Sequence, residues 1–109
     1  LNEAYEEIII VDNYANKELF DILKNINKKI YVISKNLDNI LINKYSKQYS
    51  NVTFINNDLF HDRYIILDRK TVYVSGMSLK DLGKKYSYMY KMNEKIFIND
   101  LVSRIEILL

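Results

Sequence analysis

Residues 61–85 read HDRYIILDRKTVYVSGMSLKDLGKK, and the prediction of the fold starts from this stretch. It holds the only histidine, both glycines and the densest run of positive charge in the chain. Side chains alternate along a strand, so His61 and Arg63 point to the same face of a predicted strand over residues 62–68. A second strand over residues 71–75 follows the two-residue turn Arg69-Lys70, which indicates a β-hairpin.

This hairpin and the loop after it gather an imidazole, a guanidinium, two hydroxyls and an ammonium. We expect these groups to converge near one pair of strand ends. Together they suit the binding of a phosphate and nucleophilic attack on phosphorus. The candidate residues are His61, Arg63 and Asp68 for catalysis, and Ser75, Ser78 and Lys80 for phosphate binding.

Outward from the hairpin, apolar runs alternate with segments of helical periodicity. Strands are predicted at residues 6–12, 30–34, 52–55 and 87–92. Helices are predicted at residues 17–27, at residues 39–48 with Asp38 as the cap, and from Asn93 or Asn99 to residue 108. This order predicts the α/β class, with a mixed, largely parallel sheet of about six or seven strands and helices on both faces.

Length and composition narrow the possible classes of protein. A chain of 109 residues predicts one domain over residues 1–109, and a first residue other than methionine suggests a piece of a longer protein. No apolar run reaches the roughly 20 residues of a membrane span and no signal peptide is visible, so we expect a cytoplasmic protein without a membrane partner. With one histidine and no cysteine, we expect neither a metal site nor a cofactor.

The net charge of +2 is unevenly distributed. Residues 61–95 carry eight lysines and arginines against four acidic residues, a net charge of +4. This excess favours an anionic ligand such as DNA or RNA. The alternative for any single lysine is an ordinary solvated side chain. The tyrosines after residue 72 allow base stacking, although packing between strands is the more frequent role of such residues.

The stretch resembles the signature of the phospholipase D superfamily, His-x-Lys-x4-Asp followed by a Gly-Ser-x-Asn turn. His61 and Asp68 occupy the matching positions, and Arg63 replaces the lysine. The Gly76-Met77-Ser78 turn comes one residue late and is one residue short. The sequence of the stretch is similar to sequences from a bacterial, nuclease-like branch of the superfamily. Residues 84–87, at the start of the next strand, lack the carboxylate that orients the histidine in related nucleases.

The resemblance implies a metal-independent phosphodiesterase that acts through a phosphohistidine intermediate, most plausibly a nuclease on DNA or RNA. Such enzymes use two histidines, so the single His61 implies a homodimer joined through the His61 face, with one histidine as nucleophile and the other as general acid. Arg63 would bind phosphate oxygens, and Asp68 would pair with Arg63 or hold the strand end.

Two other hypotheses follow from the residues. A catalytically silent phospholipase D-like module for dimerisation or nucleic-acid binding is favoured by Arg63 in place of lysine and by the missing carboxylate. Asp12, at the end of the first strand, could act as a phosphoacceptor of a receiver-like fold. The chain lacks the other acidic residues and the late lysine that such a site needs, which disfavours this reading.

Overall fold

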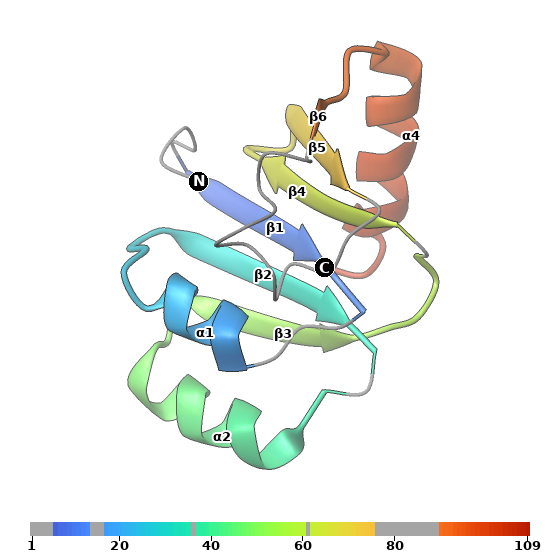
Figure 1. Cartoon of the computed structure of the whole chain (residues 1–109). Helices are drawn as coiled ribbons and strands as arrows, with labels where there is room; N and C mark the ends of the chain where they lie inside the picture. Colours follow the sequence, from blue (N-terminus) through green and yellow to red (C-terminus); the bar gives the residue numbers. More distant parts are fainter. Residues whose placement is uncertain (1–5, 14–16, 36, 61, 76–89) are drawn as a thin grey trace.

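A computed structural model describes residues 6–13, 17–35, 37–60, 62–75 and 90–109, which form one sheet and three helices (Figure 1). The strands are β1 (Glu7–Val11), β2 (Lys29–Ser34), β3 (Val52–Asn56), β4 (Arg63–Leu67), β5 (Thr71–Ser75) and β6 (Tyr90–Lys91). The helices are α1 (Lys17–Leu23), α2 (Asn39–Gln48) and α4 (Lys95–Glu106). The predicted α/β class and the number of strands are confirmed for these residues.

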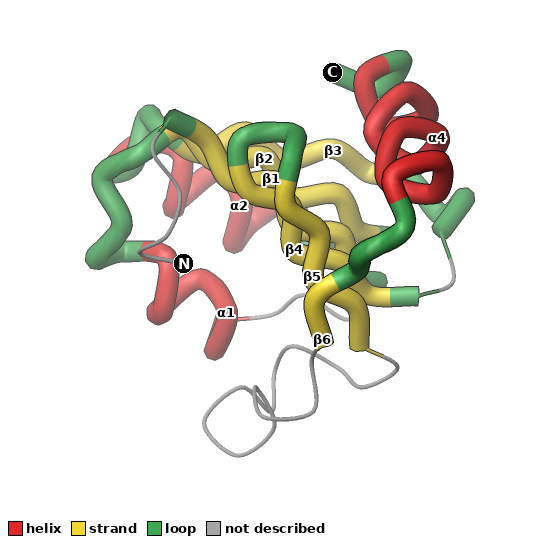
Figure 2. Tube along the Cα trace, turned by 90° about the horizontal axis from the view of Figure 1, so that it is seen from above, coloured by secondary structure: helices red, strands yellow, loops and turns green. Residues whose placement is uncertain are grey.

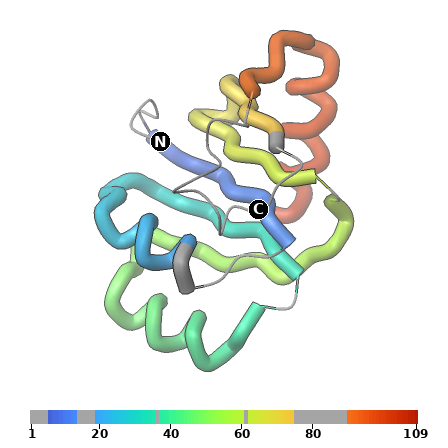
Figure 3. The backbone as a smooth tube through the Cα atoms, in the orientation of Figure 1, coloured from blue at the N-terminus to red at the C-terminus, as the bar shows by residue number. Residues whose placement is uncertain are grey.

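The strand β1 lies inside the sheet because it is apolar along nearly its whole length. Ile8, Ile9 and Ile10 are fully buried, and their side chains alternate between the two faces of the sheet. The strand order is β3-β2-β1-β4-β5-β6. Figure 3 shows β1 in blue between β2 and β4, although β4 is more than 50 residues further along the chain.

The sheet is mixed, and the expectation that it would be largely parallel is wrong. Between the described strands, β1–β2 and β2–β3 pair in parallel, whereas β1–β4, β4–β5 and β5–β6 are antiparallel. The two βαβ units give the parallel half. Each helical crossover returns the chain to the end of the sheet at which the previous strand began, so the next strand runs in the same direction. The strand β4 then enters beside β1 in the opposite direction, and its hairpin continues that arrangement.

Helices cover both faces of the sheet, as predicted (Figure 2). On one face α1 and α2 bury Leu19, Phe20 and Tyr45 against β1, β2 and β3. On the other face α4 buries a stripe of Leu101, Val102 and Ile105 against the opposite set of strand residues. This alternation explains why an apolar run such as β1 can be buried on both sides.

The ends of the helices show which local signals were reliable. Asp38 caps α2, as predicted: its carboxylate accepts hydrogen bonds from the amides of Ile40 at 2.9 Å and Leu41 at 3.3 Å. The helix predicted at residues 17–27 ends at Leu23, because the weak helix formers Asn25 and Asn27 follow.

Neither Asn93 nor Asn99 caps the last helix. The N-cap of α4 is Glu94, whose side chain makes no capping hydrogen bond. Of the strand predicted at residues 87–92, residues 90–92 fall within the described ranges, and β6 covers Tyr90–Lys91. Within the described ranges, no helix has the length and hydropathy needed to cross a bilayer.

Candidate functional site

Polar side chains meet where β1 and β2 end and β4 begins. Asp12 follows β1 and is fully buried, and its backbone amide donates to the carbonyl of Ile33 at 3.0 Å. Arg63 opens β4, and its Nε lies 3.5 Å from Oδ1 of Asp12. The antiparallel register, with Val11 opposite Tyr64, places the two charges face to face. Asp12 and Arg63 therefore form a buried ion pair between the two central strands.

Two further contacts hold the same end of the sheet. The side-chain Nδ2 of Asn13 donates to the carbonyl of Phe60 at 2.7 Å, which ties the end of β1 to the segment before β4. Ser34, at the end of β2, is fully buried, and its hydroxyl donates to the carbonyl of Lys35 at 3.3 Å. These two hydrogen bonds fix the backbone that follows β1 and β2.

The structure places the predicted site residues in three different situations. The register of the hairpin puts Arg63 opposite Ser75. Asp68 follows the last residue of β4, five residues from Arg63, so at about 3.3 Å per residue the two lie about 16 Å apart. His61, Ser78 and Lys80 lie outside the described residues, and of Ser75 only the backbone is described.

Asp68 does not lie beside Arg63, so the pairing of these two residues, one of the two roles expected for Asp68, is wrong. Its Oδ1 accepts hydrogen bonds from the backbone amides of Glu6 at 2.7 Å and Glu7 at 3.0 Å. Its own amide donates to the carbonyl of Glu7 at 3.0 Å. Of the two roles expected for Asp68, these contacts match the holding of a strand end.

The hairpin turn is centred on Asp68 and Arg69 rather than on Arg69 and Lys70. Both central residues have positive φ, 55° and 58°, and the amide of Lys70 donates to the carbonyl of Leu67 at 3.0 Å. Two-residue turns of this kind match the twist of the flanking strands, which explains why non-glycine residues adopt positive φ here.

Arg69 fastens this turn to two distant elements. Its Nε lies 2.6 Å from Oε1 of Glu7, and its terminal nitrogen lies 2.8 Å from Oε2 of Glu106. The hydrogen bonds to Glu7 and then to Glu106 raise the pKa of the Arg69 guanidinium above its usual value. Two cations of the basic stretch, Arg63 and Arg69, are thus neutralised by carboxylates within the fold.

A second concentration of positive charge lies over the other half of the sheet. Residues 17–49 carry seven lysines and three acidic residues, a net charge of +4, and α2 itself contains no acidic residue. By contrast, residues 94–106 around α4 have a net charge of −1. Four of these lysines, on and after α1 and α2, form what we call the lysine face: Lys24, Lys28, Lys44 and Lys47.

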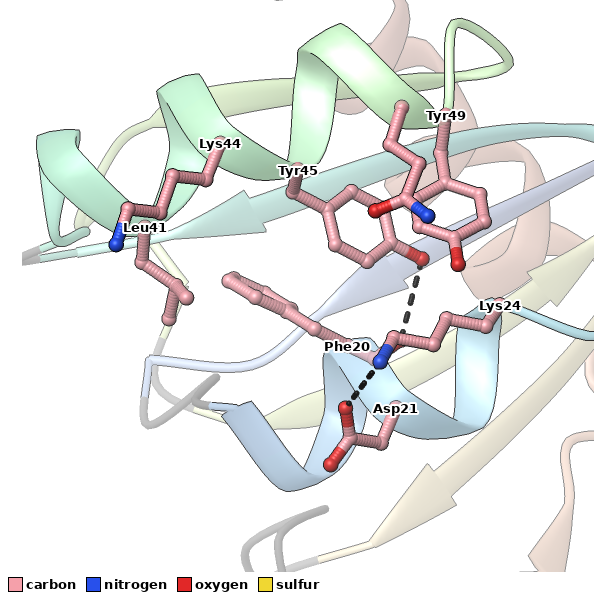
Figure 4. Close-up of a pocket in the computed structure, with 8 residues that line it drawn as sticks. Phe20, Asp21, Lys24, Leu41, Lys44, Tyr45 and Tyr49 are labelled. Carbon is pink, nitrogen blue, oxygen red and sulfur yellow. Dashed lines mark hydrogen bonds and ion pairs between the residues drawn. The ribbon is translucent and has the colours of Figure 1, made fainter.

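A groove of about 120 Å³ runs between α1 and α2 (Figure 4). Its lining residues are Phe20, Asp21, Lys24, Leu41, Lys44, Tyr45, Gln48 and Tyr49. In Figure 4 Lys24 and Tyr49 lie toward one end of the groove, and Lys44 and Leu41 toward the other. Lys24 pairs with Asp21 at 3.0 Å, and this hydrogen bond raises the pKa of Lys24.

Aromatic rings hold the two helices of this groove together. The ring of Tyr45 lies 5.4 Å from that of Phe20 and 4.6 Å from that of Tyr49, measured between centroids. The Tyr45 hydroxyl donates to the carbonyl of Phe20 at 3.1 Å. The groove therefore has a fixed aromatic wall with charged groups at its rim.

Burial raises the pKa of Tyr45 to about 12, with smaller contributions from Tyr49 and Asp21. Because an unfolded tyrosine ionises near pH 10, the folded state holds this proton more tightly, and we expect stability to fall as the pH rises from about 10 to about 12. Urea titrations over this range measure the loss. It should shrink in Tyr45→Phe relative to the unchanged chain, and an equal pH slope in both would contradict the assignment.

The groove and the lysine face were missed in the sequence, although one signal was present. Leu41, Tyr45 and Gln48 recur at helical spacing, which puts them on one side of α2. Residues 1–60 as a whole carry seven lysines and eight acidic residues, a net charge of −1, which hides the lysines because five of these acidic residues lie outside residues 17–49. Among the described residues, no three histidine, cysteine or acidic side chains are grouped as metal ligands would be.

The fold and these sites define a small α/β domain with a six-stranded mixed sheet between helical layers. No family model matches the chain, and a search of curated proteins finds no match. Among solved structures the chain is similar to TrmBL2, described as an archaeal chromatin protein with a novel mode of DNA binding. The TM-score is 0.56 at 19% identity, over 95% of this chain and 43% of the other. The likeness shows the fold, and the chain spans less than half of TrmBL2.

These comparisons overturn the predicted membership of the phospholipase D superfamily. A similar structure is that of a chromatin protein, and no family model, of that superfamily or another, matches. The prediction rested on the signature, on the glycine turn after it and on the order of elements, and two residues of the signature, Arg63 and Asp68, prove to be engaged in contacts that hold the sheet. The hydrolase activity that the resemblance implied is corrected with it, and nucleic-acid binding is the part that remains compatible.

Proposed function

We propose that this chain is a non-catalytic module that binds nucleic acid through the lysine face. The observation that carries the non-catalytic part is the ion pair between Arg63 and the fully buried Asp12. A guanidinium held in this way is already neutralised, and its remaining exposure is 14%. Arg63, which the sequence predicted to bind phosphate, therefore neutralises a buried carboxylate inside the sheet.

The choice of ligand is supported by charge and by similarity. Lys44 and Lys47 project from one side of a helix that lacks acidic residues, and both are exposed. Lysines arranged in this way neutralise backbone phosphates without reading sequence. The similar protein TrmBL2 is described as binding DNA, which supports the same class of ligand for this chain.

Binding should depend steeply on salt and on these two lysines. Fluorescence anisotropy of a labelled oligonucleotide, measured over a series of salt concentrations, gives the slope of log K against log salt. In Lys44→Gln/Lys47→Gln that slope should fall by about 1.8 on duplex DNA or about 1.4 on a single strand, the loss of two phosphate contacts.

The matched control is Lys70→Gln/Lys95→Gln, which removes two exposed lysines outside the lysine face. This variant should retain the unchanged slope. If the slope fell equally in both double variants, the effect would come from net charge alone, and the lysine face would not be the binding surface. The homodimer through the His61 face stays a prediction, because His61 lies outside the described residues.

A further inference from the structure

We propose that the groove between α1 and α2 holds one unpaired base, so that single-stranded nucleic acid is the preferred ligand of the lysine face. This inference rests on the proposed function and adds to it the strand state of the ligand. In a duplex each base is stacked and paired inside the helix, where it cannot enter a groove on a protein surface.

The size of the groove selects a single ring. Its volume of about 120 Å³ is slightly below the roughly 150 Å³ apolar cavity that accepts benzene. Sites for larger organic ligands and cofactors occupy about 300–1,000 Å³. The groove is therefore closer in size to a single six-membered ring than to a dinucleotide or a fused polycyclic ligand.

The wall of the groove is suited to stacking. Phe20 and Tyr45 are 3% and 6% exposed, so their rings are held by the core, whereas Tyr49 is half-buried at the end of α2. The ring of Tyr49 is tilted 33° from the ring of Tyr45, and Tyr45 packs against it and holds it in place. Aromatic platforms of this kind bind bases with little sequence preference.

Polar groups at the rim match the rest of a nucleotide. Lys44 supplies positive charge on α2, Lys24 and Asp21 form an exposed ion pair on α1, and Gln48 supplies an amide that can hydrogen-bond a base edge. The rim has two cations and one anion, so it favours a ligand with one negative charge close to the ring. A nucleotide unit in a single strand carries one phosphate per base.

The test compares the binding of a labelled strand of ten thymidine nucleotides with that of a duplex of equal length, on the 109-residue chain. The unchanged chain should bind the single strand at least tenfold more tightly. Tyr49→Phe keeps the ring and should retain this preference, whereas Tyr49→Leu keeps apolar bulk without a ring and should lose about tenfold in single-strand affinity. Matching unfolding midpoints for the two variants exclude a folding defect.

A second measurement needs no variant. A strand containing 5-iodouracil is irradiated in the complex, and the cross-linked peptide is identified by mass spectrometry. The expected product is the tryptic peptide of residues 48–63, in which Tyr49 is the single tyrosine. A cross-link confined to other peptides would overturn the groove as the base site.

The two proposals fail in distinguishable ways. Equal affinity for single strand and duplex, with both reduced in Lys44→Gln/Lys47→Gln, overturns the base in the groove and leaves the proposed function standing. Absence of binding to either nucleic acid overturns both. If thymidine monophosphate competed as strongly per site as the strand does, the ligand would be a free nucleotide. That result would also overturn single-stranded nucleic acid as the ligand.

Discussion

Replacing Arg63 by methionine is expected to lower the free energy of unfolding by about 3 kcal/mol. The change leaves the carboxylate of Asp12 fully buried without the guanidinium that lies 3.5 Å from it. Removal of one partner of a buried pair costs about 3–5 kcal/mol, and the lower end applies because Arg63 keeps some contact with water. Urea unfolding followed by circular dichroism measures the difference.

Two companion variants decide what the effect means. In Asp12→Asn/Arg63→Met the buried charge is gone, so more than half of the lost stability should return. Lys70→Met removes an exposed cation of the same hairpin and should change stability by less than about 0.5 kcal/mol. If Arg63→Met behaved like Lys70→Met, Arg63 would be a solvated side chain available to a ligand, contrary to the assignment made above.

Replacing Asp68 by alanine is expected to cost about 2–4 kcal/mol. Alanine at a φ of 55° costs about 1–2 kcal/mol, because its Cβ approaches the following carbonyl. Loss of the acceptor for the amides of Glu6 and Glu7 adds about 1–2 kcal/mol. This is a large fraction of the stability of a domain of this size.

Asparagine and glycine at position 68 separate the two causes. Asp68→Asn keeps an acceptor and tolerates positive φ, so it should retain more than half of the stability that alanine loses. Asp68→Gly relieves the backbone and lacks the acceptor, so it should fall between asparagine and alanine. The order Asn, Gly, Ala in decreasing stability is the expected result. If the glycine and alanine variants had equal free energies of unfolding, the positive φ at position 68 would not contribute to the loss.

The parts of the fold that could be predicted are those set by neighbours in sequence. The apolar run of β1, the Asp38 cap of α2 and the pairing of β4 with β5 all follow from local patterns. The turn was misplaced by one residue, because positive φ at Asp68 and Arg69 depends on contacts that Asp68 makes with residues about 60 positions away.

The candidate sites could be predicted less well, since each depends on the order of elements in space. Asp12 was considered alone, because nothing in the local pattern says that β1 lies beside β4 and opposite Arg63. The groove likewise requires α1 and α2 to lie on the same face at one particular separation. Residue types were visible in the sequence, and their partners were not.

The central place of β1 has a consequence for the growing polypeptide on the ribosome. One edge of β1 can pair with β2 soon after synthesis, but the other edge waits for β4, whose first partner residue lies more than 50 positions later. At about 5–20 residues per second this delay lasts roughly 3–11 seconds. During that time an Ile-rich strand edge is exposed to other chains, so we expect the yield of native protein to depend on translation speed and chaperone supply.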